Sequence, residues 1–308
     1  MNRKDWYPAL WAIIYIVLLL VSLTVPLVNI ITIHLLIVPL VVLYMRLMKL
    51  RFILTIAVLV AILWGVLGSF GLALVIITLF LLPTAMVLAI MYKRNASAQI
   101  VIITGFLTLL GQMLFLLVIL YAIGLNPINQ FQSYVQEVAN NIKPMASISI
   151  DSSYIDRVIP IVVKMIPLFM ISIAMIYVVI THGVARKVLN RSGIEVEALP
   201  PLREWRLPKS MIGYYIVAVI LDLFINIEAD SILATLAINL MPMMTVAFTI
   251  QAFSFFRYVI HVKQWKRWLP IIPLVLIIVI FPLVNLISWI GILDTVFPIR
   301  ERIAKSNE

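Results

Sequence analysis

The chain has 308 residues, of which 64% are hydrophobic and only 12% are charged, and its mean hydropathy is +1.15. Soluble domains are roughly 45–50% apolar and about 25% charged, so this composition excludes a soluble globular protein and indicates a membrane protein. The net charge is +10 and there is no cysteine, which excludes a disulfide framework, a thiolate nucleophile and an iron–sulfur site.

About nine apolar runs follow one another along the chain. A transmembrane helix needs about 20 apolar residues, and these runs are apolar on every face, unlike the alternating strands of a barrel. The sequence therefore predicts an all-α fold, a polytopic transmembrane helical bundle of about nine spans within a range of about eight to ten. The runs lie at about 8–27, 31–45, 52–67, 71–91, 98–123, 157–183, 211–226, 231–256 and 269–298.

The distribution of basic residues predicts the orientation. Lys and Arg accumulate on cytoplasmic loops, and most of the 23 in this chain fall on one side if the N-terminus is cytoplasmic. The first run follows Arg3 and Lys4 but no small-x-small cleavage site follows it, so we expect a retained first span. Basic loops facing anionic lipid account for the net charge, so the bilayer is the expected partner and nucleic acid is not.

The spacing of turns and polar segments predicts three regions. Residues 1–193 form a six-span bundle, 194–210 form a cytoplasmic proline and tryptophan segment, and 211–308 form a membrane region of two to four spans. Within the first region, apolar positions step by three and four through an external amphipathic helix at about 127–141, with Asn126 as its N-cap. That helix is either a lid over an outward vestibule or a helix resting on the headgroups.

The stretch "LPPLREWRLPKS" (199–210), called the elbow below, stands out in the apolar chain. Its three prolines prevent a regular helix, so the chain must turn before the next span begins near Ser210. Two interpretations fit Arg203, Trp205 and Arg206. They are an interface anchor with the indole at headgroup depth, or a surface that docks a partner protein.

Four polar residues within the spans are candidate substrate-binding residues, because such groups are costly in lipid unless they pair or act. Lys164 and Asp222 lie in the outer halves of their spans, where they either form an ion pair or extend separately to the outer surface. Gln112 and Asn239 lie deeper and should seek partners on neighbouring helices.

No sequence motif of a known catalytic centre is present. The three histidines are scattered without ligand spacing, and no nucleotide-binding or hydrolase motif occurs. We therefore expect no metal, no cofactor and no enzyme activity, with an intramembrane enzyme as the less favoured alternative.

The last apolar run is ambiguous. At about 32 residues it is roughly 48 Å of helix, too long for one upright span of roughly 30 Å and too short for two. We expect a single tilted span that places Asp294 and Arg300 at the outer interface. The alternative is a hairpin of half-spans broken near Pro282 and Asn285.

Two stretches carry a family resemblance. "LPPLREWRLPK" in the elbow and "GILDTVFPIRER" (291–302) resemble the YybS-like family of bacterial predicted membrane proteins, a family of unknown function. The resemblance implies a multi-pass protein of the bacterial plasma membrane. The arrangement of the first six spans is also similar to the S components of energy-coupling factor transporters, which implies uptake of a small molecule.

Two functions are compatible with these observations. The first is a small-molecule transporter or its substrate-binding membrane subunit, which is coupled to ions or served by a separate ATPase because no Walker motif is present. The alternative is a non-transporting membrane scaffold or assembly factor that docks a partner through the elbow. Of the two, transport is the expectation that the sequence favours.

Overall fold

The computed structural model describes residues 6–142, 152–266, 268–280 and 282–305, and every regular element within them is helical. Six of these helices are long and apolar enough to cross a membrane, or seven if the bent pair α12–α13 is one span. The predicted all-α, polytopic architecture is therefore confirmed.

Residue contacts divide the chain into two compact units. The first comprises Met1–Leu125 and Met170–Leu199, and the second comprises Asn126–Phe169 and Pro200–Glu308. Residues 126–169 thus group with the C-terminal part of the chain, whereas the sequence pattern places them in the six-span bundle.

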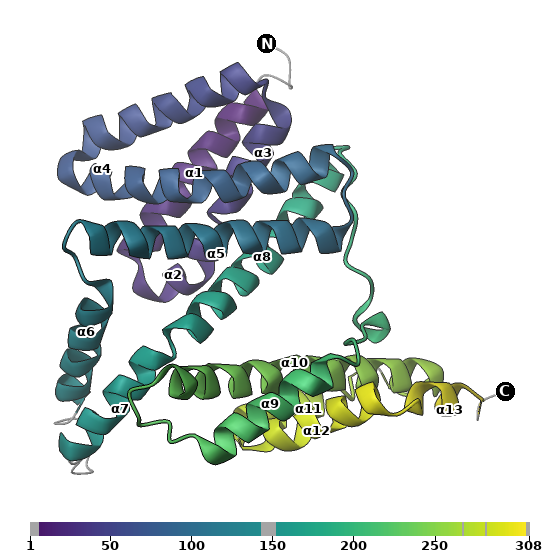
Figure 1. Cartoon of the computed structure of the whole chain (residues 1–308). Coiled ribbons are helices and arrows are strands. Elements are labelled where there is room, and N and C mark those ends of the chain that lie inside the picture. The colour runs from purple at the N-terminus through teal and green to yellow at the C-terminus, as the bar shows by residue number, and fades with distance from the viewer. Residues whose placement is uncertain (1–5, 143–151, 267, 281, 306–308) are drawn as a thin grey trace. The chain divides into compact units, whose positions relative to one another are not determined.

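The helices of the first unit follow the predicted runs (Figure 1). Gly68 takes a left-handed φ of 56° and interrupts the 45-residue α4, so two predicted runs become two arms of one folded element. The arms approach closely, since a Cβ on Gly71 would lie 1.9 Å from the backbone oxygen of Leu63. The unit contains α1 (Trp6–Thr24), α2 (Pro26–Thr32), η1 (Ile33–Leu35), α3 (Ile37–Arg46), α4 (Lys49–Lys93), α5 (Ala98–Ala122) and most of α8 (Ile166–Arg191).

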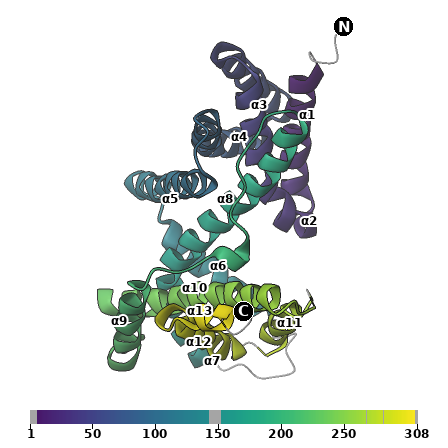
Figure 2. The same ribbon diagram turned by 90° about the vertical axis from the view of Figure 1, so that its right-hand side faces the viewer.

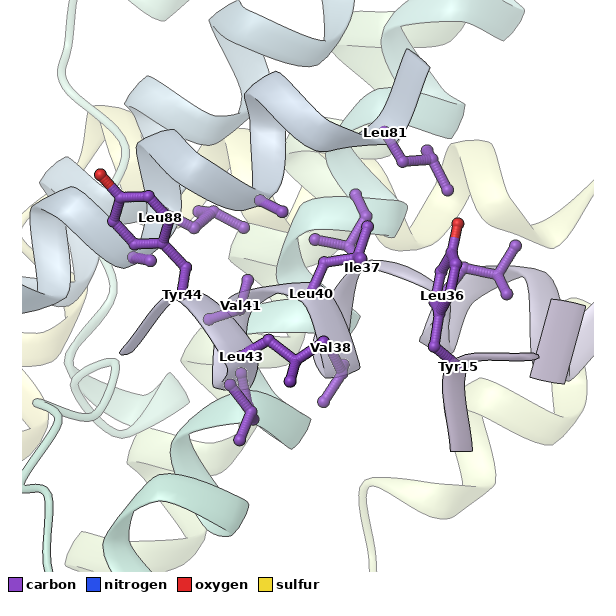
Figure 3. Close-up of a cluster of buried hydrophobic side chains, with 14 of the residues drawn as sticks. Tyr15, Leu36, Ile37, Val38, Leu40, Val41, Leu43, Tyr44, Leu81 and Leu88 are labelled. Atoms are coloured by element: carbon purple, nitrogen blue, oxygen red, sulfur yellow. The ribbon is translucent and has the colours of Figure 1, made fainter. Parts of the chain in front are cut away.

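The core of the first unit surrounds α3 (Figure 3). Every side chain from Ile37 to Tyr44 is buried, as expected for a helix that is apolar on all faces. Tyr15 on α1 donates a hydrogen bond to Thr78 on α4, with 2.8 Å between the two hydroxyl oxygens. Lipid is as apolar as these side chains, so close packing and such polar contacts are what hold the helices together.

The second unit begins with the predicted amphipathic helix. It is present as α6 (Pro127–Ile142), and Asn126 caps it by accepting hydrogen bonds from the backbone N–H groups of Ile128 and Asn129, both at 3.1 Å. Whether it covers a vestibule or rests on headgroups stays a prediction. The unit's other elements are α7 (Ser152–Lys164), the start of α8, η2 (Leu202–Glu204), α9 (Met211–Phe224), α10 (Ile232–Val262), α11 (Ile271–Val279), α12 (Leu283–Val296) and α13 (Ile299–Lys305).

The C-terminal run is broken, so the expected single tilted span is wrong. The nine-residue α11 ends at Val279, and Pro282 cannot donate the backbone hydrogen bond that a continuous helix needs. After the break, α12 runs alongside α10 (Figures 1 and 2). A Cβ on Gly291 would lie only 1.8 Å from the backbone oxygen of Phe248, so glycine permits the close packing of α12 on α10.

These breaks explain why fewer long helices are present than apolar runs. The folded α4 is counted once among the long helices, although it contains two predicted runs. Its 45 residues would make roughly 68 Å of helix over both arms, more than twice the roughly 30 Å thickness of the hydrocarbon core. The 14-residue α9 and the 9-residue α11 are too short to cross upright alone.

Candidate functional site

A buried ion pair lies at the end of α12. The Arg300 guanidinium donates to both carboxylate oxygens of Asp294, at 2.9 Å from Nε to Oδ1 and 2.6 Å from Nη2 to Oδ2. The two side chains are only 4% and 1% exposed. The single tilted span predicts both residues at the outer interface and says nothing of their pairing, whereas the structure buries them together against α10, because α12 returns alongside that helix.

Two polar side chains of α10 complete this buried cluster. Arg300 Nη2 donates to the Ser254 hydroxyl at 3.0 Å, and the Gln251 amide donates to Asp294 Oδ2 at 2.5 Å. The guanidinium also lies over the ring of Tyr258, 5.2 Å from its centroid. We call Gln251, Ser254, Asp294 and Arg300 the buried cluster.

The buried cluster holds the backbone of the elbow. Arg300 Nη1 donates to the carbonyl oxygen of Arg203 at 2.9 Å, and the Ser254 hydroxyl donates to that of Trp205 at 2.6 Å. The backbone N–H of Leu207 donates to Gln251 Oε1 at 2.9 Å. The elbow is thus bonded to α10 and α13 at residues 203, 205 and 207, the first in the short 3-10 helix η2 and the other two beyond it, which fixes a segment that its prolines keep out of a longer helix.

The cluster acts mainly by positioning. The attraction within a buried ion pair roughly offsets the cost of removing both charges from water, so such a pair is a weak net stabiliser. Breaking it is costly, however, because one buried charge is then left without its partner. The arrangement therefore favours one geometry of the elbow over all others.

The elbow presents its predicted residues in different ways. Arg206 is exposed and Arg203 is half-buried, with its Nε 3.6 Å from the carboxylate of Glu204. Trp205 is half-buried, and its indole N–H donates to the carbonyl oxygen of Pro200 at 2.8 Å. The indole therefore forms a hydrogen bond within the elbow, while the exposed Arg206 side chain is accessible to a binding partner.

A hollow of about 570 Å³ lies beside the elbow. Its cationic groups come from two elements, Arg203 in η2 and Arg257 in α10, and His261 Nδ1 is 3.5 Å from Arg203 Nη1. The other lining residues are Pro201, Leu202, Ile260, Gln264 and Trp265.

The four predicted substrate residues do not form one described cluster. Gln112 lies in the first unit, where its amide donates to the carbonyl oxygen of Phe80 and its carbonyl accepts from the Thr84 hydroxyl. Both contacted residues lie within one helical turn of Pro83, which has no backbone N–H and so removes one hydrogen bond from α4. Gln112 thus has the interhelical contacts expected of a polar group in lipid, and its role in binding a substrate stays a prediction.

Asn239 bridges a helix break in the second unit. Between α7 and α8, the backbone N–H of Leu168 donates to Asn239 Oδ1 at 2.8 Å, and Asn239 Nδ2 donates to the carbonyl oxygen of Lys164 at 2.7 Å. In a continuous helix those two backbone groups would bond to each other. Pro167 disrupts that turn, and one amide satisfies both freed groups.

Lys164 does not form the ion pair considered from the sequence. Its Nζ donates to the carbonyl oxygens of residues 227, 228 and 229, at 3.3, 3.2 and 2.7 Å. Among the described residues, no salt bridge joins it to Asp222, whose side chain is exposed. The amine thus supports the turn between α9 and α10, and a substrate role for both residues stays a prediction.

Sequence reasoning missed the partners of the elbow on α10. Gln251 and Ser254 are three residues apart in an apolar helix, which places them on one face. That spacing predicts a polar face on the helix, but it does not predict which segment of the chain packs against this face.

Comparison with known proteins agrees with this architecture. The family model described as "Predicted membrane protein (DUF2232)" matches residues 13–295, which include the elbow, α10 and Asp294. The uncharacterized protein YybS of Bacillus subtilis (strain 168) is 21% identical over 219 residues, covering 69% of this chain and 71% of that protein. No solved structure matches. Because the family model covers most of its length, the chain belongs to the DUF2232 family of predicted membrane proteins.

Proposed function

We propose that this integral membrane protein is a scaffold or assembly factor that docks a partner protein through the elbow. The observation that carries the proposal is the set of hydrogen bonds from the buried cluster to the backbone of Arg203, Trp205 and Leu207. A connector between two spans needs no such support. A segment held in one conformation loses little conformational entropy when a partner binds, which favours recognition.

The chemistry of the elbow defines the partner. Arg203, Arg206 and Lys209 offer three cations against the single carboxylate of Glu204, and all lie within seven residues. A partner presenting acidic side chains complements this surface. By the positive-inside tendency, the elbow and its partner lie on the cytoplasmic side of the plasma membrane.

Photo-cross-linking in intact cells tests this function. A photoreactive residue in place of Ser210, the exposed last residue of the elbow, should form a discrete adduct with one protein, and the Arg203→Ala change should remove the adduct without lowering the melting temperature. The matched control is Leu223, which is 71% exposed on α9. No protein adduct at position 210, or the same adduct at positions 210 and 223, would contradict docking.

Transport of a small molecule is the second candidate function. The similarity of the first six spans to substrate-binding S components of energy-coupling factor transporters suggests it. Two discontinuities in the second unit favour it, the α7–α8 break at Met165 and the α11–α12 break near Pro282. Transporters build sites at such broken helices. A metabolite that raises the melting temperature of the purified protein, with the rise abolished by Asn239→Ala, would support transport. No stabilising compound across a broad panel would count against it.

A further inference from the structure

The lining of the hollow combines charges with apolar and aromatic surface. Arg257 and His261 are four residues apart on α10, so they share a face, and Arg203 approaches from the elbow. Guanidinium groups match the oxygens of phosphate with paired hydrogen bonds. Leu202, Ile260 and Trp265 supply apolar surface for the group that carries the phosphate.

The contact between Arg203 and His261 orients the imidazole. A guanidinium has only donors, so at 3.5 Å from Nη1 the Nδ1 of His261 acts as the acceptor. His261 also lines the hollow, so its imidazole adds a polar ring to the two guanidinium groups there.

Two features oppose an anion here, and together they carry less charge than the two guanidinium groups of Arg203 and Arg257. Glu204 carries one negative charge near Arg203, and the C-terminal end of α10 carries roughly half a negative charge. The last carbonyls of α10 are already bonded, those of Val259 and Ile260 to the backbone N–H groups of Lys263 and Trp265 at 2.8 and 3.0 Å. The two guanidinium charges therefore leave the hollow net positive.

We propose that the hollow binds a phosphate group. Two sources share this chemistry, the headgroup of an anionic glycerophospholipid and a soluble phosphate ester. The surroundings match the headgroup level, because Trp265 and Trp268 are 51% and 53% exposed at the point where α10 ends and the apolar α11 begins. This binding goes beyond the proposed docking and requires no partner protein.

Binding measurements on the purified full chain test the proposal. Nanodiscs of phosphatidylcholine with and without phosphatidylglycerol probe the lipid source, and glycerol 3-phosphate titrated into phosphatidylcholine nanodiscs probes the soluble source. Arg257→Gln should weaken binding about tenfold, the loss expected for one guanidinium–phosphate contact. Arg257 is exposed, so the change should leave the fold intact.

Lys266→Gln is the matched control, because it removes one nearby exposed charge that does not line the hollow. Its affinity should stay within about twofold of wild type. Binding of neither probe, or equal losses in the two variants, would overturn the proposal. The Arg206→Ala variant separates the two functions, since it should lose the docked partner and keep phosphate binding.

Discussion

Removing Arg300 should destabilise the protein and release the elbow. The Arg300→Met change leaves the Asp294 carboxylate buried with the Gln251 amide as its one polar partner among the described side chains. Breaking one side of a buried ion pair costs about 3–5 kcal/mol. At roughly 2–4 °C per kcal/mol, the melting temperature should fall by about 6–20 °C.

A double-mutant cycle checks the reasoning. Asp294→Asn added to Arg300→Met removes the uncompensated charge, so the double variant should lose less stability than the two single variants together. Thermal unfolding in an uncharged detergent measures each loss. Strict additivity would refute the account of a coupled buried pair.

Limited digestion with trypsin supplies a second readout. Arg206 and Lys209 are exposed cleavage sites on the elbow, and hydrogen bonds to the buried cluster hold the backbone around them. Arg300→Met should speed cleavage there, because it removes one of these bonds and weakens the others. The control is Arg302→Met, an exposed neighbour on α13. Equal cleavage of the two variants would show that the cluster does not hold the elbow.

Three further predictions follow from the second unit and from α5. Single cysteines in place of Lys305 and Ser210 in this cysteine-free chain should react with a membrane-impermeant maleimide from the same side of the membrane, because Arg300 contacts the backbone of the elbow. Labelling of the two positions from opposite sides would contradict that contact. Asn239→Ala should cost about 1–3 kcal/mol in thermal unfolding, because it leaves two backbone groups without partners, and a loss below about 0.5 kcal/mol would rule out the bridge. Gly291→Ala should lower the melting temperature, whereas Gly111→Ala, whose added methyl meets open space, should raise stability by up to about 1 kcal/mol; equal effects would contradict the close packing of α12.

The sequence by itself determined the local structure of this protein. Apolar runs must form helices in lipid, because every backbone polar group needs a partner within the segment. Short-range chemistry also placed α6 after Asn126, the interruption of α4 at Gly68, and the start of α9 after the prolines of the elbow. These features depend on residues close together in the chain, so they are readable without a fold.

Only the tertiary structure decided how the polar groups pair. The length of the last apolar run allowed both a single tilted span and a pair of helices with a break between them. The structure has the broken pair, in which Gly291 lets α12 pack closely on α10. Asp294 meets Gln251 across 43 positions, and Asn239 meets Lys164 across 75. Many partners satisfy a buried polar group equally well by chemistry, so the choice among them depends on which helices pack together.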